Sequence, residues 1–257
     1  MTPPPPDMSQ TFALKSALRK SMLRQLKTLP DELVEQQSQA VANILFEAPF
    51  FRRARSVACY LSMAHGELRT NGIVSEVLRR GTPLFIPYLP PPSSSSSTSS
   101  STHSPSAVAP QIAIPAHNVP HEMRMLRLYS PEDMQRCPLD KWGILDPGEY
   151  RLDVPDEQHE RREDALDGTA PDLDLILLPG VAFDEECNRL GRGKAYYDRF
   201  LASYTTSRNS PLLVALALSP QLLPSGDKVP TTDTDFQLDG VLSPSGLVWR
   251  QGREPTR

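Results

Sequence analysis

Leu175-Ile176-Leu177-Leu178-Pro179-Gly180 is an apolar run of strand length that ends at a Pro-Gly pair. Soon after it comes Asn188-Arg189-Leu190-Gly191-Arg192-Gly193-Lys194-Ala195-Tyr196-Tyr197-Asp198-Arg199, which combines glycines, cations, tyrosines and an aspartate. Such a loop can hold a phosphate, a metal ion and an aromatic ring at once. So many different chemical groups within so few residues are hard to explain as packing. The stretch therefore predicts a functional site that follows a buried strand.

Strands and helices alternate around this stretch. The predicted strands share short apolar or alternating runs and lie at 56–61, 83–87, 123–128, 173–178, 212–218 and 239–242. The predicted helices share apolar residues at helical spacing and lie at 11–28, 30–48, 70–80 and 193–204. This alternation predicts an α/β chain, a single-domain Rossmann-like three-layer fold with a mostly parallel sheet and helices on both faces.

Length and composition narrow the class of protein. A chain of 257 residues with 39% hydrophobic residues can bury one sizeable core, so one domain is expected. The formal net charge of −4 argues against a dedicated nucleic-acid or membrane-surface protein. The apolar runs fall short of the roughly 20 residues that cross a bilayer. The cysteines, at positions 59, 137 and 187, lie far apart and fit a reducing compartment.

Three segments are expected to lie outside the core. Residues 1–9 begin with a proline run and predict a disordered tail. Residues about 90–118 are rich in Ser, Thr and Pro and carry no Asp, Glu, Lys or Arg, which predicts a disordered insertion. A tolerated surface insertion is favoured there over a phosphorylated regulatory loop. Residues about 149–170 are predominantly acidic and predict a solvated loop.

The amino-terminal 30 residues are basic and contain one acid, Asp7. That composition is also typical of a mitochondrial transit peptide. The run of four prolines from Pro3 to Pro6, however, prevents a helix from starting at the first residue. We expect a cytoplasmic protein, with a mitochondrial location as the alternative.

The glycine loop has the composition of an anion site. Gly191 and Gly193 allow a tight turn that brings backbone N–H groups close to an anion, and a following helix adds its dipole. Arg189, Arg192 and Lys194 supply positive charge for phosphate oxygens. The spacing fits neither a Walker A loop nor G-x-G-x-x-G. From these residues alone, a surface turn with solvated cations stays an open alternative.

A carboxylate follows the loop. Asp198 is well placed to hold Mg²⁺, whose preferred ligands are oxygens shared with substrate phosphates. The alternative is a first-turn acid that the helix dipole favours. A second oxygen ligand could come from Asp233, Asp235 or Asp239.

Further candidates lie away from the loop. Lys15 and Arg19 are four residues apart on one predicted helix, so both project from one face and could clamp a phosphate or simply be solvated. Glu67 follows the strand at 56–61, at the carboxyl edge where doubly wound folds bind ligands. Trp142 lies in a loop marked by Pro and Gly, which favours ring stacking over core packing. The tyrosine pair after the glycine loop could contact a ring, although such pairs on helices are more often core.

Taken together, these residues resemble the 5-formyltetrahydrofolate cyclo-ligase family, also called methenyltetrahydrofolate synthetases. The motifs L-L-P-G-V-A-F-D at 177–184 and N-R-L-G-R-G-K-A-Y-Y-D at 188–198 carry the resemblance. It implies an ATP- and Mg²⁺-dependent cyclisation of 5-formyltetrahydrofolate to 5,10-methenyltetrahydrofolate that releases ADP and phosphate. In that reaction ATP phosphorylates the formyl oxygen. The implied partners are these small molecules, with no nucleic acid and no membrane, and we expect a monomer.

The resemblance also implies a role for each matching residue. ATP contacts are implied at Lys15, Arg19, Arg189, Leu190, Gly191, Arg192, Gly193, Lys194 and Tyr197. Substrate contacts are implied at Leu61, Glu67, Trp142 and Tyr196. The implied Mg²⁺ ligands are Asp198 and Asp235. The implied catalytic residues are Lys194, Arg192 and Tyr196.

The chain departs from the family pattern at Ala195, where relatives usually have a third glycine. A methyl group there restricts φ and could crowd the folate or slow the loop. Two alternatives therefore stand beside the enzyme: a non-catalytic folate- or nucleotide-binding relative that acts as an interaction module, and a different phosphotransfer enzyme on the same fold. The complete set of cations, carboxylates and tyrosines favours the enzyme.

Overall fold

The computed structural model describes residues 7–90, 122–140 and 143–255. In this part of the chain a seven-stranded sheet has the order β3-β2-β1-β4-β7-β8-β9. Neighbouring strands from β2 to β8 are parallel, and β3 and β9 pair antiparallel at the two edges. The predicted α/β fold with a mostly parallel sheet is thus confirmed. The strands are β1 (Val57–Cys59), β2 (Leu84–Tyr88), β3 (Arg124–Leu128), β4 (Leu175–Leu178), β7 (Leu212–Leu216), β8 (Gly240–Ser243) and β9 (Gly246–Trp249).

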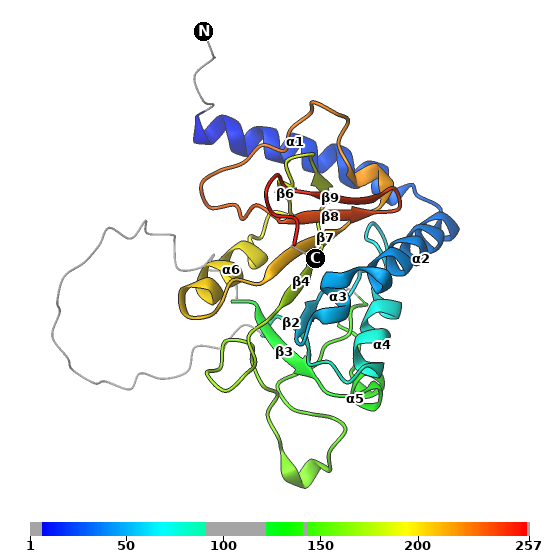
Figure 1. The fold of residues 1–257 in the computed structure, drawn as a ribbon, viewed down its shortest axis with the longest axis vertical. Coiled ribbons are helices and arrows are strands. Elements are labelled where there is room, and N and C mark those ends of the chain that lie inside the picture. Colours follow the sequence, from blue (N-terminus) through cyan, green and yellow to red (C-terminus); the bar gives the residue numbers. More distant parts are fainter. Residues whose placement is uncertain (1–6, 91–121, 141–142, 256–257) are drawn as a thin grey trace, which may run out of the picture.

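Helices cover both faces of this sheet (Figure 1). Side chains alternate between the faces along each strand, so Val57 and Cys59 pack in one core cluster and Ala58 in the other. Burial on both faces explains why the central strands are apolar without interruption. The helices packed on the first face are α2 (Asp31–Glu47), α3 (Pro49–Arg53), α4 (Asn71–Arg79) and α5 (Pro131–Arg136). The helix on the second face is α6 (Tyr196–Ser207).

The first helix, α1 (Met8–Lys27), joins the first core cluster through Leu26, near its end. Its Met22 joins a small apolar cluster with the hairpin of β5 (Ala182–Phe183) and β6 (Arg189–Leu190). The apolar residues at helical spacing in this helix are not all buried: Leu14 is 47% exposed, whereas Lys15 is buried. Lys15 is buried because it forms an ion pair with Asp235.

The boundaries of several elements differ from those predicted. The helix expected at 193–204 begins at residue 196, because positive φ angles at Gly193 and Ala195 exclude the preceding residues from a right-handed helix. Residues 8 and 9 of the expected tail belong to α1, which begins at Met8, and residues 1–6 of that tail lie outside the described residues. The sequence did not predict several short elements. They are α3, α5, β9, the hairpin, and the 3-10 turns Asp156–Gln158 and Ser219–Gln221.

The acidic segment is only in part the solvated loop that its charge predicted. Arg162 is 3% exposed and donates two hydrogen bonds to the fully buried carboxylate of Asp133, one of them 2.6 Å long. Asp164 is also buried and accepts from the Arg124 guanidinium at 2.7 Å. Paired charges therefore anchor the second half of the segment, while the stretch 157–161 is exposed. The insertion expected at about 90–118 lies almost wholly outside the described residues.

Candidate active site

The glycine loop joins β6 to α6 in a strained turn. Gly193 has φ 93°, and Ala195 has φ 50° and ψ 28°, which is the left-handed region. A Cβ atom on Gly193 would lie 3.3 Å from the Cζ of Arg19, and one on Gly191 would lie 3.1 Å from Nη1 of Arg189. Glycine is required at 193 by the positive φ of the turn. At both 191 and 193 it also leaves room for the arginine side chain that lies against the backbone.

Helix α1 contributes one cation to this loop and one to the segment before β8. The Arg19 Nε donates to the Gly191 carbonyl at 2.8 Å, and Lys15 forms an ion pair with Asp235. Burial lowers the pKa of the Arg19 guanidinium from its ordinary value, and the Asp235 charge opposes that change. Of the predicted pair of cations, Arg19 therefore contacts the glycine loop and Lys15 contacts a candidate metal ligand.

A third cation connects the loop to the end of β1. The Nε of Arg192 lies 2.9 Å from Oε1 of Glu67, and Oε2 of Glu67 accepts from the Met63 N–H at 3.1 Å. Glu67 is buried. The sequence predicted this carboxylate at the carboxyl edge of the sheet, and the structure brings it against the glycine loop.

The two candidate metal ligands each accept hydrogen bonds from a basic side chain. Both oxygens of Asp198 lie 3.0 Å from Nη2 of Arg189, and Oδ1 also accepts from the Phe236 N–H at 3.2 Å. Oδ2 of Asp235 accepts from Lys15 and Thr232. Desolvation raises the pKa of Asp235, but the hydrogen bonds from Lys15 and Thr232 outweigh it and hold that pKa below its ordinary value. The Asp235 carboxylate is therefore charged at neutral pH.

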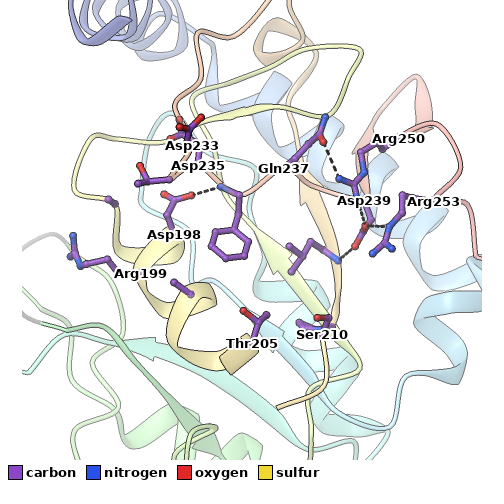
Figure 2. A pocket seen from close by; sticks show the side chains of 16 residues that line it. Asp198, Arg199, Thr205, Ser210, Asp233, Asp235, Gln237, Asp239, Arg250 and Arg253 are labelled. Carbon is purple, nitrogen blue, oxygen red and sulfur yellow. Dashed lines mark hydrogen bonds and ion pairs between the residues drawn. The ribbon is translucent and has the colours of Figure 1, made fainter. Parts of the chain in front are cut away.

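These carboxylates suit a metal that shares its shell with a substrate. The described residues contain no group of three His, Cys, Asp or Glu side chains that could hold a metal on their own. Asp198 and Asp235 line one cavity (Figure 2). The hydrogen bonds that Asp235 accepts from described residues all go to its Oδ2. Mg²⁺ is usually bound by one or two carboxylates together with phosphate and water oxygens. The donor set fits that pattern.

Arginine side chains lie over the tyrosine pair. The Arg199 guanidinium lies 5.5 Å from the Tyr196 ring centre, and that of Arg189 lies 5.6 Å from the Tyr197 ring centre. Burial raises the pKa of the Tyr197 hydroxyl above its ordinary value, so this tyrosine stays protonated. Tyr197 also packs against both core clusters, which makes it partly a core residue.

We call the first of two cavities the loop cavity. It measures about 930 Å³ and opens at the carboxyl ends of β1, β2 and β4, where Leu61, Tyr88 and Pro179 line it. Its wall is apolar on the side of Tyr60, Leu61, Pro87, Tyr88, Ile144 and Leu145. The predicted site residues that line it are Leu61, Glu67, Arg189, Gly191, Arg192, Lys194, Tyr196, Tyr197 and Asp198.

We call the second the C-terminal cavity (Figure 2). It measures about 840 Å³ and lies between the start of α6 and the segments 233–239 and 250–253. It shares Ala195 and Asp198 with the loop cavity. Sequence reasoning missed Arg250 and Arg253 on its wall, because no local pattern shows that the last residues return beside α6.

Two of the implied ligand contacts, at Leu190 and Trp142, differ from the others. The Leu190 side chain is buried in the cluster with Met22, so any contact with ATP at this residue has to come from its backbone. Trp142 lies outside the described residues, while Ile144, two residues later, lines the loop cavity.

Comparisons with known proteins agree with the motifs. Residues 11–244 match the sequence model of the 5-formyltetrahydrofolate cyclo-ligase family. The chain is 31% identical to the mitochondrial 5-formyltetrahydrofolate cyclo-ligase of Arabidopsis thaliana, over 94% of this chain and 78% of that protein. It is 29% identical to the mouse 5-formyltetrahydrofolate cyclo-ligase, over 89% and 92% of the two chains. The NMR structure of Aquifex aeolicus 5,10-methenyltetrahydrofolate synthetase superposes with a TM-score of 0.63 at 25% identity, covering 95% of this chain and 96% of that one.

Proposed function

The chain belongs to the 5-formyltetrahydrofolate cyclo-ligase family and is an enzyme of that class, and from this premise we propose how it works. It uses MgATP to convert 5-formyltetrahydrofolate into 5,10-methenyltetrahydrofolate, with release of ADP and phosphate. The observation that carries the proposal is the meeting of two cavities at Ala195 and Asp198, beside the loop that supplies Arg192 and Lys194. A reaction between two substrates needs such a junction.

The loop cavity takes the folate. Its apolar wall suits a flat ring system, and Glu67 offers a carboxylate that can accept hydrogen bonds from ring N–H groups. Tyr196 lines the loop cavity directly after the shared residue Ala195, so its hydroxyl can donate to the formyl group. Trp142 is proposed as a further ring contact.

The C-terminal cavity takes the nucleotide, with the phosphates directed toward the glycine loop. Asp198 and Asp235 would hold Mg²⁺, which when bound neutralises part of the phosphate charge. Lys15 and Arg19 reach the same region from α1. The cations and carboxylates of this site pair with one another, and MgATP carries both a cation and anionic phosphates. When MgATP binds, the carboxylates can pair with Mg²⁺ and the cations with the phosphates. No buried charge is then left without a partner.

The reaction has two steps, a phosphoryl transfer and a ring closure. The formyl oxygen attacks the γ-phosphorus while the bond to the β-phosphate oxygen breaks and ADP leaves. Arg192 and Lys194 then stabilise the charge on the transferring group, which is most of what phosphoryl transfer asks of a protein. N10 attacks the activated formyl carbon and loses its proton, the carbon–oxygen bond to phosphate breaks, and the methenyl product forms.

The test is the near-ultraviolet absorbance of the methenyl product in purified protein mixed with 5-formyltetrahydrofolate. We expect a rise that requires both ATP and Mg²⁺. Lys194→Ala should abolish it without changing the melting temperature, because Lys194 is exposed. Lys228→Ala is the matched control, because Lys228 is an exposed cation paired with Glu186 on the surface.

Two results would contradict the proposal. Near-normal turnover of the Lys194→Ala variant would remove that side chain from the site. Wild-type protein that binds 5-formyltetrahydrofolate but forms no product would favour the non-catalytic relative.

Three further proposals concern the molecule as a whole. We propose that the chain forms one domain, that it acts as a monomer, and that it works in the cytoplasm without nucleic-acid or membrane partners. In the described part of the chain, no helix is both long and apolar enough to cross a bilayer.

A further inference from the structure

The far end of the C-terminal cavity is built around a buried carboxylate. Asp239 is 1% exposed, and its Oδ2 accepts from the Leu213 N–H at 2.9 Å. Its Oδ1 accepts from two arginines, from Nη2 of Arg250 at 3.0 Å and from Nε of Arg253 at 2.6 Å (Figure 2). Two cations on one carboxylate leave one unit of positive charge at this end of the cavity.

Other contacts hold these arginines in place. The Nη1 of Arg250 donates to the Gln237 side-chain oxygen at 2.9 Å, and Gln237 in turn donates to the Glu186 carbonyl at 2.8 Å. The Arg250 backbone N–H donates to the Asp239 carbonyl at 2.8 Å, directly after β9. Its Nε is buried and has no hydrogen-bond partner among the described residues. The Arg250 guanidinium is therefore oriented by the fold, and one of its donors is unused.

The near end of the same cavity is lined by carboxylates, beside the cation Arg199. Asp198, Asp233 and Asp235 line it there, across the cavity from the arginines (Figure 2). The walls between the two ends include the apolar side chains of Phe236 and Leu213. A volume of about 840 Å³ lies in the range that small-molecule sites occupy.

We infer that Arg250 and Arg253 form the nucleoside end of the nucleotide site, where they bind the base and ribose of the adenine nucleotide. The inference rests on the proposed function, which directs the phosphates to the acidic end and the glycine loop. A planar guanidinium stacks on an aromatic base and donates hydrogen bonds to ring nitrogens and hydroxyl oxygens. The family match ends at residue 244, so these arginines belong to a segment that the match does not cover.

The experiment separates the nucleoside from the phosphates. Isothermal titration calorimetry of the full-length protein measures binding of MgADP and, separately, of inorganic pyrophosphate with Mg²⁺. Arg253→Ala should weaken MgADP binding about tenfold, the scale of a desolvated cation–aromatic contact, and should leave pyrophosphate binding within about twofold. Arg79→Ala is the control, because Arg79 is an exposed arginine paired with Glu76 on α4.

A second variant guards against misfolding. Arg253→Lys keeps a cation beside Asp239 but loses the planar group, so it should fold normally and still weaken MgADP binding selectively. An equal loss for both ligands, or no loss for either, would overturn the inference. Wild-type protein that fails to bind MgADP would overturn the proposed function itself, and this inference with it.

Discussion

Ala195 occupies a backbone conformation that a glycine would adopt with less strain. Its φ of 50° and ψ of 28° lie in the left-handed region, immediately before α6. For a residue with a Cβ this conformation costs about 1–2 kcal/mol, whereas glycine adopts it freely. Glycine in turn loses roughly 0.5–1 kcal/mol more backbone entropy on folding. Ala195→Gly should therefore stabilise the protein by about 0.5–1 kcal/mol.

Ala202→Gly is the matched control for this substitution. Ala202 is exposed in the middle of α6, where glycine should destabilise the protein by about 1 kcal/mol. Urea unfolding followed by circular dichroism would measure both variants, and the same substitution should have opposite signs at two positions seven residues apart. In a chain of this size the melting temperature of the Ala195→Gly variant should rise by about 1–4 °C.

The result that would refute this reasoning is a loss of stability at Ala195 equal to the loss at Ala202. It would mean that the turn before α6 does not adopt the left-handed conformation in solution. Because Ala195 lines both cavities, the same variant also tests whether its methyl group crowds the substrates. We expect its turnover to be no lower than that of the wild-type protein.

Two other predictions concern buried and half-buried charges. Asp133→Ala should cost about 3–5 kcal/mol in urea unfolding, because it leaves the buried Arg162 guanidinium without its partner; a loss below about 1 kcal/mol would contradict the buried pair. The folded-state pKa of Asp235 lies below its ordinary value of about 4. The ion pair of Asp235 therefore stabilises the protein fully at pH values above the ordinary pKa. This stabilisation is lost as the pH falls through the folded-state pKa. Asp235→Asn should consequently lower stability at neutral pH and flatten its acid dependence, and an unchanged acid dependence would exclude this role.

Local patterns in the sequence account for most of the architecture. The apolar run of β4 predicts a strand buried on both faces, and the helical spacing of Val34, Val41 and Leu45 predicts the buried side of α2. The glycine loop also carries its own signal, because glycines beside cations indicate an anion site. The family motif at 188–198 favours that site over a surface turn with solvated cations. Each of these features depends on residues within a few positions of one another, so the sequence displays it directly.

The pairing of charges across the chain depends on the tertiary structure. Lys15 meets Asp235 over a separation of 220 residues, and Arg192 meets Glu67 over a separation of 125. These contacts form only when the strand order places β1 beside β4 and α1 beside the hairpin.

The sequence by itself determined the α/β class, the glycine loop and the resemblance to the cyclo-ligase family. The tertiary structure alone decided that Lys15 is buried, that Arg162 anchors the acidic segment, and that two cavities meet at Ala195 and Asp198. The physical reason is that secondary structure follows from local periodicity. A buried charge, by contrast, is tolerated only where the fold brings a partner to it, and that partner can lie anywhere in the chain.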